Sequence, residues 1–296
     1  MVWIPGRTFL MGSDRHYRDE APAHRVAVDG FWMDHTPVTN ADFRKFVRAT
    51  GHVTVAELAP DPAPYPEALP EMLHPGSLVF VSPPAPVDMR DSRNWWQFVP
   101  GANWRHPSGP NSSIQDRGDH PVVHIAYQDA VTYARWAGKS LPTEAEWEMA
   151  ARGGIEAADY AWGAELMPDG CPMANFWQGE FPWQNSRTHG YEGTSPVRAF
   201  PPNGYGVLDM IGNVWEWTTD WYTTWHPAEQ AKACCIPRHP RGREARDRRV
   251  TKGGSHLCSP NYSMRCRPAA RFPEPVDTST CHLGFRCVVR PESAGR

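Results

Sequence analysis

The chain has 296 residues, of which 40% are hydrophobic and 21% are charged, and its formal net charge is −3. This composition excludes a disordered chain, and the small net charge gives no sign of a nucleic-acid-binding or membrane-surface protein. No apolar run approaches the roughly 20 residues that span a bilayer, and the N-terminus lacks a secretory signal, so we expect a soluble, cytoplasmic protein.

Glycine, proline and aromatic residues are unusually frequent. The 24 glycines and 31 prolines make up about 19% of the chain, against an average near 12%. The prolines stand among 14 tryptophans and 11 phenylalanines, whose rings need burial or a binding partner. Because no fixed-period repeat is present, solenoids and propellers are excluded. These features predict a compact fold of loops and short elements.

Two regions carry the pattern of amphipathic helices. The first predicted helix covers residues 40–50, begins after Thr39 as its N-cap and ends at Gly51. The second region is a helical hairpin, with one helix over 127–137 and another that opens with a capping box at Thr143. Each boundary is thus predicted from a residue type that favours it.

The rest of the chain has a broken hydrophobic pattern. Short stretches between turn signals, at 26–33 and 284–289, are typical of strands. We interpret the proline-rich segment 59–86 as a long loop. Segment 226–249, which ends in a basic run, is interpreted as a solvated loop and not as an anion site. Neither is a linker strong enough to divide the chain, so we expect one domain over residues 1–296.

The seven cysteines cannot all pair in disulfides, because their number is odd. Four of them lack the short spacing of structural zinc ligands, namely Cys258, Cys266, Cys281 and Cys287. Three are interpreted as small buried hydrophobes, namely Cys171, Cys234 and Cys235. Cys258 follows two glycines and stands near Ser255 and Tyr262, which is a polar, accessible setting suited to a reactive or metal-binding thiol.

Two further patterns contain potential metal ligands. His120 and His124 could offer two imidazoles, but Ala126 stands where a carboxylate ligand would follow, so we favour a structural pair. Between Asp209 and Glu216 a glycine turn exposes carbonyl groups, and such hard oxygen ligands suit Ca²⁺. The alternative is a turn in which the two acids accept backbone N–H groups.

Nine segments, in the same order, resemble the formylglycine-generating enzyme family, the sulfatase-modifying factors. They are residues 4–13 (IPGRTFLMGS), 37–43 (PVTNADF), 101–107 (GANWRHP), 120–124 (HPVVH), 136–148 (WAGKSLPTEAEWE), 174–181 (ANFWQGEF), 212–217 (GNVWEW), 252–255 (KGGS) and 283–287 (LGFRC). The resemblance covers nearly the whole chain. It implies a single, loop-rich α+β domain that is distantly similar to C-type lectins and has little regular secondary structure.

The activity that the resemblance implies is a copper-dependent oxidation. Family members use O₂ and copper to convert one cysteine of a sulfatase, within a Cys-x-Pro-x-Arg motif, to Cα-formylglycine. Two thiolates hold Cu(I), a metal that soft ligands select, and the first of them corresponds to Cys258. Residues matching the pocket for the substrate thiol and oxygen are Ser255, Tyr262 and Trp215. The expected partner is a sulfatase polypeptide or peptide, and the expected state is a monomer.

The sequence departs from the family at the second copper cysteine, which falls at Ser263. A neutral hydroxyl is a poor ligand for Cu(I), so the two-thiolate site is weakened. Three explanations stay open. The chain is an engineered cysteine-to-serine variant, a natural homologue in which Cys266 or Cys281 supplies the second thiolate, or an inactive paralogue that binds substrate without oxidising it. Strand alternation would point Cys266 away from Ser263, so its use requires a local bend.

The resemblance also implies calcium sites. One consists of two side chains and two carbonyls, from Asp209, Glu216, Gly212 and Val214. A second would use Asn175 and the carbonyls of Phe176 and Tyr191. At that second site His189 replaces the aspartate of the family, which argues against calcium there.

The disulfides of secreted family members are not expected in this chain. Their partner positions are occupied by Ala134, Ala151 and Pro268. Cys287 is therefore expected to be a free buried thiol, as in a reducing cytoplasm.

Two other function classes use the same fold. A non-catalytic protein would bind a sulfatase or peptide on this scaffold and would have no affinity for copper even with a cysteine at 263. Sulfoxide synthases of ergothioneine biosynthesis carry an iron-binding bundle ahead of the shared domain and a His-x₃-His-x-Glu motif, and this sequence has neither. The oxidase is the leading interpretation.

Overall fold

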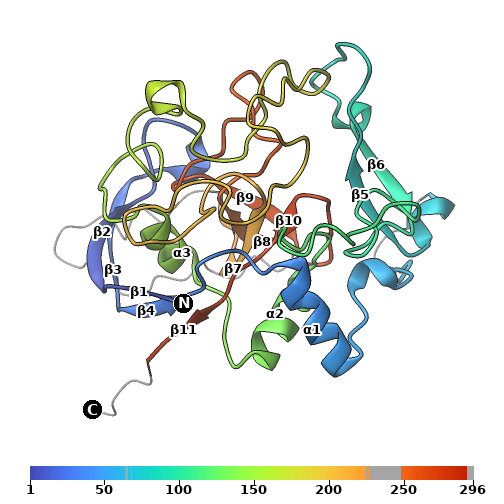
Figure 1. Ribbon diagram of the computed structural model, residues 1–296, viewed down its shortest axis with the longest axis horizontal. Coiled ribbons are helices and arrows are strands. Elements are labelled where there is room, and N and C mark those ends of the chain that lie inside the picture. The colour runs from blue at the N-terminus through green and yellow to red at the C-terminus, as the bar shows by residue number, and fades with distance from the viewer. Residues whose placement is uncertain (64–65, 68, 225, 227–247, 292–296) are drawn as a thin grey trace.

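Loops join short strands and a few helices in the computed structural model, which describes residues 1–63, 66–67, 69–224, 226 and 248–291 (Figure 1). The α-helices are α1 (Asn40–Thr50), α2 (Tyr127–Trp136) and α3 (Glu144–Ala151), and the 3₁₀ turns are η1 (Arg18–Glu20), η2 (Val55–Glu57), η3 (Pro70–Leu73), η4 (Ser92–Asn94) and η5 (Pro168–Gly170). The strands are β1 (Val2–Ile4), β2 (Arg7–Met11), β3 (His24–Val28), β4 (Phe31–Met33), β5 (Gly76–Phe80), β6 (Trp96–Pro100), β7 (Trp215–Trp221), β8 (Arg248–Lys252), β9 (Arg271–Pro275), β10 (Leu283–Gly284) and β11 (Val288–Val289).

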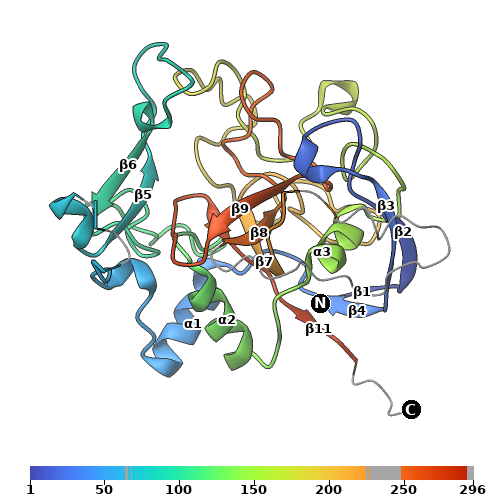
Figure 2. The same cartoon turned by 180° about the vertical axis from the view of Figure 1, so that it is seen from behind.

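A four-stranded sheet lies at the centre of the molecule. Its order is β10-β7-β8-β9, with β10 parallel to β7 and the other pairs antiparallel. Both ribbon views place α3 with β1–β4 on one side of this sheet and α1 with α2 on the other, while the β5–β6 hairpin stands apart at one end (Figures 1 and 2). The central sheet therefore connects the two halves of the core.

Local signals predicted the helices well. The Thr39 hydroxyl accepts the Asp42 N–H, and α1 ends at Gly51, which has φ 69°. Thr143 forms the expected capping box with Glu146 at the start of α3. The helix predicted over 127–137 ends one residue earlier, at Trp136. None of the helices within the described residues is long and apolar enough to cross a membrane.

Three predictions about strands and loops need correction. Segment 26–33 is not one strand, because Gly30 packs against the Trp3 ring and separates β3, which pairs with β2, from β4, which pairs with β1 and β11. Segment 284–289 likewise contributes to two sheets. The predicted loop 59–86 contains β5, paired with β6. Of segment 226–249, residues 227–247 lie outside the described residues, and so do Cys234 and Cys235.

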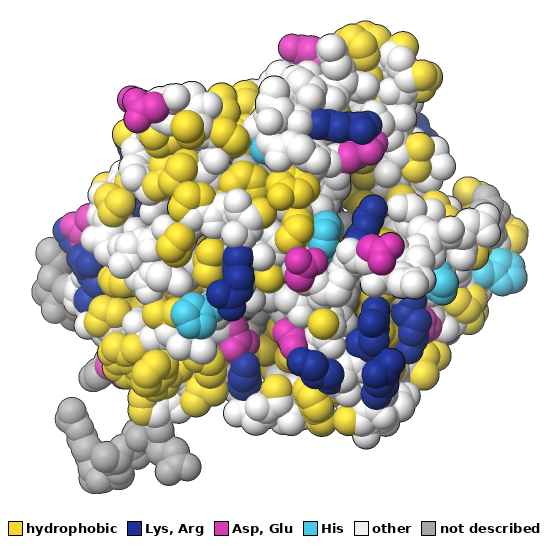
Figure 3. Space-filling model, viewed as in Figure 1, with side chains coloured by type: hydrophobic (Ala, Val, Ile, Leu, Met, Phe, Trp, Pro, Cys, Tyr) yellow, Lys and Arg dark blue, Asp and Glu magenta, His cyan; other side chains and the backbone are white. Residues whose placement is uncertain are grey.

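The core has two large parts. One packs α3 against β2 and β3. The other is aromatic and joins α1 and α2, with Phe43 stacked on Tyr133 at 5.9 Å and edge-on to Trp104 at 5.2 Å. Cys287 is a fully buried free thiol in this second part, as predicted. On the face shown in Figure 3, charged side chains of both signs are interspersed and basic ones gather over α1, in keeping with the small net charge.

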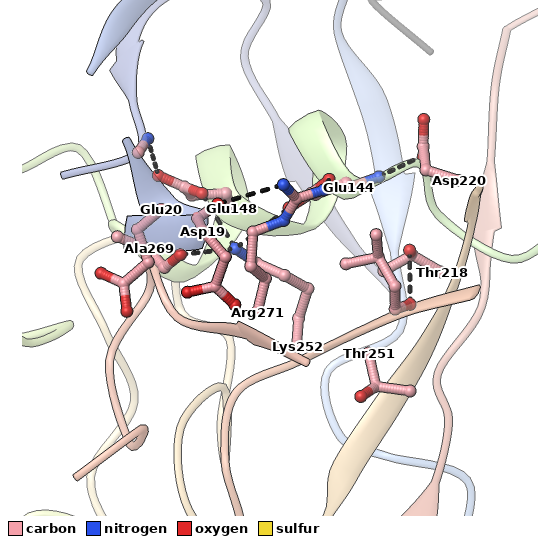
Figure 4. Close-up of polar contacts among 12 residues, drawn as sticks. Asp19, Glu20, Glu144, Glu148, Thr218, Asp220, Thr251, Lys252, Ala269 and Arg271 are labelled. Carbon is pink, nitrogen blue, oxygen red and sulfur yellow. Dashed lines mark hydrogen bonds and ion pairs between the residues drawn. The ribbon is translucent and has the colours of Figure 1, made fainter. Parts of the chain in front are cut away.

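Buried ion pairs hold α3 on the central sheet. Lys252 at the end of β8 is fully buried and donates to Glu148 at 2.9 Å, and Arg271 on β9 contacts Glu144 at 2.8 Å. Figure 4 shows Lys252 and Arg271 reaching toward these two carboxylates of α3. Burial acts to raise the pKa of Glu148, but the charges of Lys252 and Arg152 overcome it and hold that pKa at about 2. The end of β8, where the candidate site begins, is therefore firmly fixed.

Candidate active site

Two glycines shape the loop between β8 and Cys258. Gly253 and Gly254 both have left-handed backbone conformations, with φ 96° and 71°. A Cβ atom at position 254 would lie 2.8 Å from Cys258 Sγ and 2.8 Å from the Arg265 carbonyl oxygen. Glycine at 254 therefore lets the chain fold back on itself around the Cys258 sulfur.

The Cys258 side chain is enclosed by protein. Only 4% of the residue is exposed, which corrects the expectation of an accessible thiol, because the returning chain at 265–266 covers it. The Ser255 N–H donates to Cys258 Sγ at 3.4 Å. Cys266, which is fully buried, donates its S–H to the Ser255 carbonyl at 3.4 Å and lies close enough to Cys258 to affect its pKa. The two sulfurs therefore contact the backbone of the same residue, Ser255.

The two thiols differ in acidity. Burial acts to raise the pKa of Cys258, but the hydrogen bond from Cys266 and those from backbone groups outweigh it, so the pKa is lowered. Burial and the neighbouring Cys258 raise the pKa of Cys266 well above its usual value. The pair therefore favours a thiolate at Cys258 beside a protonated thiol at Cys266, and the thiolate is the form that reacts and binds soft metals.

The local bend that a Cys258–Cys266 contact requires is present. Residues 259–270 form turns, in which the Ser259 N–H donates to the Ser263 carbonyl at 3.2 Å and the Arg267 N–H donates to the Arg265 carbonyl at 2.8 Å. Strand alternation therefore does not apply to this segment. In the described part of the chain, the Ser263 hydroxyl makes no hydrogen bond, and it supplies no thiolate.

Cys281 does not take part in the thiol pair. Its sulfur accepts the Phe80 N–H at 3.2 Å, and burial raises its pKa to about 12. It lines a cavity of about 570 Å³ whose wall also includes Trp177 and His256. Of the two candidates for a second thiolate, Cys266 is thus the one that contacts Cys258. Cys171, predicted to be buried, is exposed because it directly follows the surface turn η5.

Ser255 joins the thiol pair to a histidine that the sequence did not single out. The Ser255 hydroxyl and His282 Nδ1 lie 2.9 Å apart. Burial, together with the imidazoles of His256 and His124, holds the pKa of His282 well below its usual value, so the ring is neutral. The signal for His282 was its position between Cys281 and the LGFRC motif, but nothing in the sequence linked it to Ser255.

The other two predicted pocket residues lie further out. Tyr262 is 43% exposed and stacks on Phe181 with ring centroids 4.8 Å apart. Trp215 is buried on β7 and packs against Phe272 at 5.7 Å. Within the described residues no hydrogen bond links either ring to Cys258. The structure therefore brings Ser255 to Cys258 and leaves Tyr262 as an exposed aromatic residue.

His120 and His124 have structural partners. His124 is fully buried between the Ser77 hydroxyl at 2.7 Å and the Pro107 carbonyl at 2.9 Å, and burial lowers its pKa to about 4. His120 contacts the Thr194 hydroxyl at 2.9 Å. Among the described residues no group of three or more His, Cys, Asp or Glu side chains could hold a metal ion. These contacts agree with the predicted structural pair.

At the first predicted calcium site, Glu216 already has a cationic partner. Arg286 donates to both carboxylate oxygens, at 2.7 and 2.8 Å, and the Trp147 indole N–H donates at 2.8 Å. All three side chains are buried. Glu216 thus neutralises a buried guanidinium, and its charge is not free for a metal alone.

The remaining groups of this site are better suited to a cation. Asp209 accepts one backbone N–H, from Arg198 at 3.1 Å, and burial raises the pKa of its carboxyl group. Among the described residues no group donates to the carbonyl oxygens of Gly212 or Val214. A buried acid and carbonyls that accept no hydrogen bond from the described residues are oxygen donors of the kind that Ca²⁺ takes.

The second predicted calcium site does not fit the ion. His189 Nε2 lies 2.8 Å from the Phe176 carbonyl, and the Tyr191 N–H donates to His189 Nδ1 at 3.3 Å. Since Nδ1 accepts, Nε2 carries the proton and donates to the carbonyl that a calcium ion would need. The Asn175 side chain donates to the Gly193 carbonyl at 2.9 Å. The His189 imidazole therefore uses the Phe176 carbonyl that a calcium ion would need.

Comparison with known proteins identifies the family. Residues 1–291 match the family model of the sulfatase-modifying factor enzyme 1-like domain. This chain belongs to the sulfatase-modifying factor family. The resemblance inferred from the nine segments is thereby confirmed, and so is the loop-rich α+β fold class.

Several members of the sulfatase-modifying factor family resemble this chain over nearly its full length. The formylglycine-generating enzyme of Mycobacterium tuberculosis is 55% identical, over 99% of this chain and 98% of the relative. That of Mus musculus is 47% identical, over 97% of this chain and 74% of the relative. The inactive Cα-formylglycine-generating enzyme 2 of Mus musculus is 40% identical, over 100% and 86%. The family thus contains enzymes and inactive relatives.

Solved structures share the fold. PvdO from Pseudomonas aeruginosa is 22% identical with a TM-score of 0.63, covering 97% of this chain and 92% of its own. Treponema denticola variable protein 1 is 19% identical with a TM-score of 0.64, covering 98% and 95%. At these identities the similarity concerns the fold alone, so the function must be argued from the site.

Proposed function

We propose that this protein is a formylglycine-generating oxidase, which converts the cysteine of a Cys-x-Pro-x-Arg motif in a sulfatase to Cα-formylglycine. The observation that carries the proposal is the Cys258 thiol, which has a lowered pKa and a second thiol beside it, in a chain 55% identical to a formylglycine-generating enzyme. A thiolate in such a setting suits chemistry on a substrate thiol.

The reaction replaces a thiol group by an aldehyde. The substrate CH₂–SH becomes CHO, the sulfur leaves as hydrogen sulfide, one oxygen atom of O₂ enters the aldehyde, and the other is reduced to water. The last step consumes two electrons and two protons beyond those that the substrate supplies, so an added thiol reductant is part of the proposed reaction. Copper, when bound, would supply the redox chemistry, with Cys258 as one of its thiolate ligands.

Residues around Cys258 favour its thiolate form, hold Ser255 in place and shield the sulfur from water. The Ser255 N–H donates to Cys258 Sγ at 3.4 Å, and the neighbouring Cys266 thiol also acts to lower the pKa of Cys258, so both favour its anionic form. The hydrogen bond between Ser255 and the neutral His282 fixes the serine side chain beside the sulfur pair. Enclosure of Cys258 by residues 254 and 265–266 keeps bulk water from the sulfur.

The test is oxidation of a synthetic peptide containing Cys-x-Pro-x-Arg, with Cu(I) and a thiol reductant supplied. Mass spectrometry should find the aldehyde product with this chain and none with Cys258→Ala. The Cys281→Ser variant is the matched control, since Cys281 lies at the cavity and not in the thiol pair. If neither this chain nor its Ser263→Cys variant forms the aldehyde, the oxidase proposal is wrong.

A second candidate function is binding of a sulfatase or peptide without oxidation. The observations that favour it are Ser263 at the second copper position and the 40% identity to an inactive relative. It predicts peptide binding in calorimetry together with no Cu(I) affinity in both this chain and Ser263→Cys.

We also propose that the protein is monomeric and cytoplasmic.

We propose one calcium ion at Asp209, Glu216, Gly212 and Val214. The buried Asp209 carboxyl and the two carbonyls that accept no hydrogen bond in the described part of the chain support the calcium site. A calcium ion there would connect the turn before β7 to the sheet. Equilibrium dialysis should find calcium bound to this chain, with at least tenfold weaker binding to Asp209→Asn.

A further inference from the structure

We propose that Cys258 and Cys266 together form the Cu(I)-binding pair of this protein, so that Cys266 takes the role that a cysteine at position 263 would otherwise have. The proposal rests on the proposed function and assigns the second ligand of the same site. If it is right, the copper site has a different second ligand and keeps its ability to bind Cu(I).

The first argument is the placement of the two sulfur atoms. The Ser255 N–H donates to Cys258 Sγ at 3.4 Å, and Cys266 Sγ donates to the Ser255 carbonyl at 3.4 Å. The two sulfurs therefore contact the backbone of the same residue, one at its N–H and the other at its carbonyl. Two thiols placed in this way can bind one soft ion between them, and soft thiolate ligands select Cu(I).

The second argument is that the position of Cys266 is fixed from both sides. Arg265 forms an ion pair with Asp19 at 3.1 Å, and Arg267 forms a buried one with Glu20 at 2.5 Å. Both carboxylates belong to η1, far from Cys266 in the sequence. With its two neighbours anchored to η1, Cys266 is held against Cys258 as a preorganised ligand.

The third argument concerns which metal the pair suits. A structural zinc site takes four Cys, His or carboxylate ligands, and the described residues contain no group of three or more such side chains that could hold a metal. A pair of thiolates with no further protein ligand favours Cu(I), which is soft.

The alternative donors at the site are weaker. The Ser263 hydroxyl carries no charge, and the Cys281 sulfur accepts the Phe80 N–H and lines the separate cavity. Neither therefore competes with Cys266 for the second position.

The experiment measures Cu(I) affinity and the ligands of the bound metal. The full chain, reduced and anaerobic, competes with a chromogenic Cu(I) chelator, and X-ray absorption counts the sulfur neighbours of the bound copper. We expect one Cu(I) with two sulfur neighbours. Cys266→Ser should lower the affinity by more than the roughly 10–100-fold that loss of an outer partner costs, and should remove one sulfur neighbour. Cys281→Ser should change neither value.

A double variant separates ligand loss from misfolding. Cys266→Ser combined with Ser263→Cys should regain tight binding and two sulfur neighbours if the fold is intact. The proposal is overturned if Cys266→Ser alone keeps the affinity and both sulfur neighbours. It is also overturned if this chain fails to bind Cu(I) while Ser263→Cys binds it, an outcome that leaves the oxidase proposal standing for the family site.

Discussion

The backbone of Ser255 contacts two sulfur atoms, because its N–H donates to Cys258 and its carbonyl accepts from Cys266. Single residues decide whether this arrangement exists. Glycine at 254 leaves the space for the Cys258 sulfur, and Ser263 leaves the second thiolate to another residue. At the second predicted calcium site, His189 likewise places a ring nitrogen against the Phe176 carbonyl. At each of these positions, a single side chain thus determines which ligand or contact the site can form.

At Gly254 the prediction concerns the free energy of unfolding. Gly254→Ala and Gly138→Ala both place a methyl group on a left-handed residue, with φ 71° and 66°, at a cost of about 1–2 kcal/mol. Only at 254 does the new Cβ meet other atoms, at 2.8 Å, whereas nothing lies within 4 Å at 138. Urea unfolding should show Gly254→Ala to be less stable than Gly138→Ala by about 1–3 kcal/mol. Equal stabilities would contradict the packing argument.

At His189 the prediction concerns calcium. His189→Asp removes the N–H that bonds to the Phe176 carbonyl and adds a carboxylate, so the bound calcium should rise from one ion per chain to two. Equilibrium dialysis with atomic absorption measures the number of ions. His74→Asp, at an exposed position, is the control and should leave the number unchanged. An unchanged number in His189→Asp would show that the imidazole does not block the site.

Among the elements, α3 and β8 depend on one another through buried charges. Lys252 on β8 contacts Glu148 on α3, and Arg271 on β9 contacts Glu144. These ion pairs fix the end of the strand from which the Cys258 loop starts (Figure 4). The loop that carries Cys258 therefore starts from a strand end that buried ion pairs hold in place.

The buried ion pairs make stability depend on pH. The pKa of Glu148 is about 2 in the folded chain, below its usual 4.5, so its contribution is fully present above pH 4.5 and is lost as the pH falls toward 2. The difference corresponds to about 3 kcal/mol. The free energy of unfolding, measured in urea, should fall over this range.

Removal of the charge on Lys252 tests the origin of that pH dependence. Lys252→Met should lower stability at pH 7 by about 3–5 kcal/mol, because it leaves a buried carboxylate with one partner fewer, and should flatten the decline between pH 4.5 and 2. Arg93→Met removes an exposed ion pair with Asp91 and should change neither value measurably. The explanation fails if both variants behave alike.

For the molecule as a whole, features set by residues close in the sequence could be predicted, whereas features set by contacts between distant residues could not. The boundaries of α1 were predictable because Thr39 and Gly51 act on their own helix ends. The division of 26–33 into β3 and β4 was not, because it is set by partner strands and by Trp3. The contact of Cys266 with Cys258 depends on ion pairs from 265 and 267 to η1, more than 240 positions away, so no spacing rule could reveal it.

The oxidation of a sulfatase-type peptide is the central claim, and O₂ consumption tests it most directly. With copper, a thiol reductant and a Cys-x-Pro-x-Arg peptide supplied, this chain should consume one O₂ for each formylglycine formed, above the rate without peptide. Cys258→Ala and Cys266→Ser should abolish the peptide-dependent consumption, and Cys281→Ser should retain it. Peptide-dependent consumption that persists in Cys258→Ala, or its absence in both this chain and Ser263→Cys, would contradict the account.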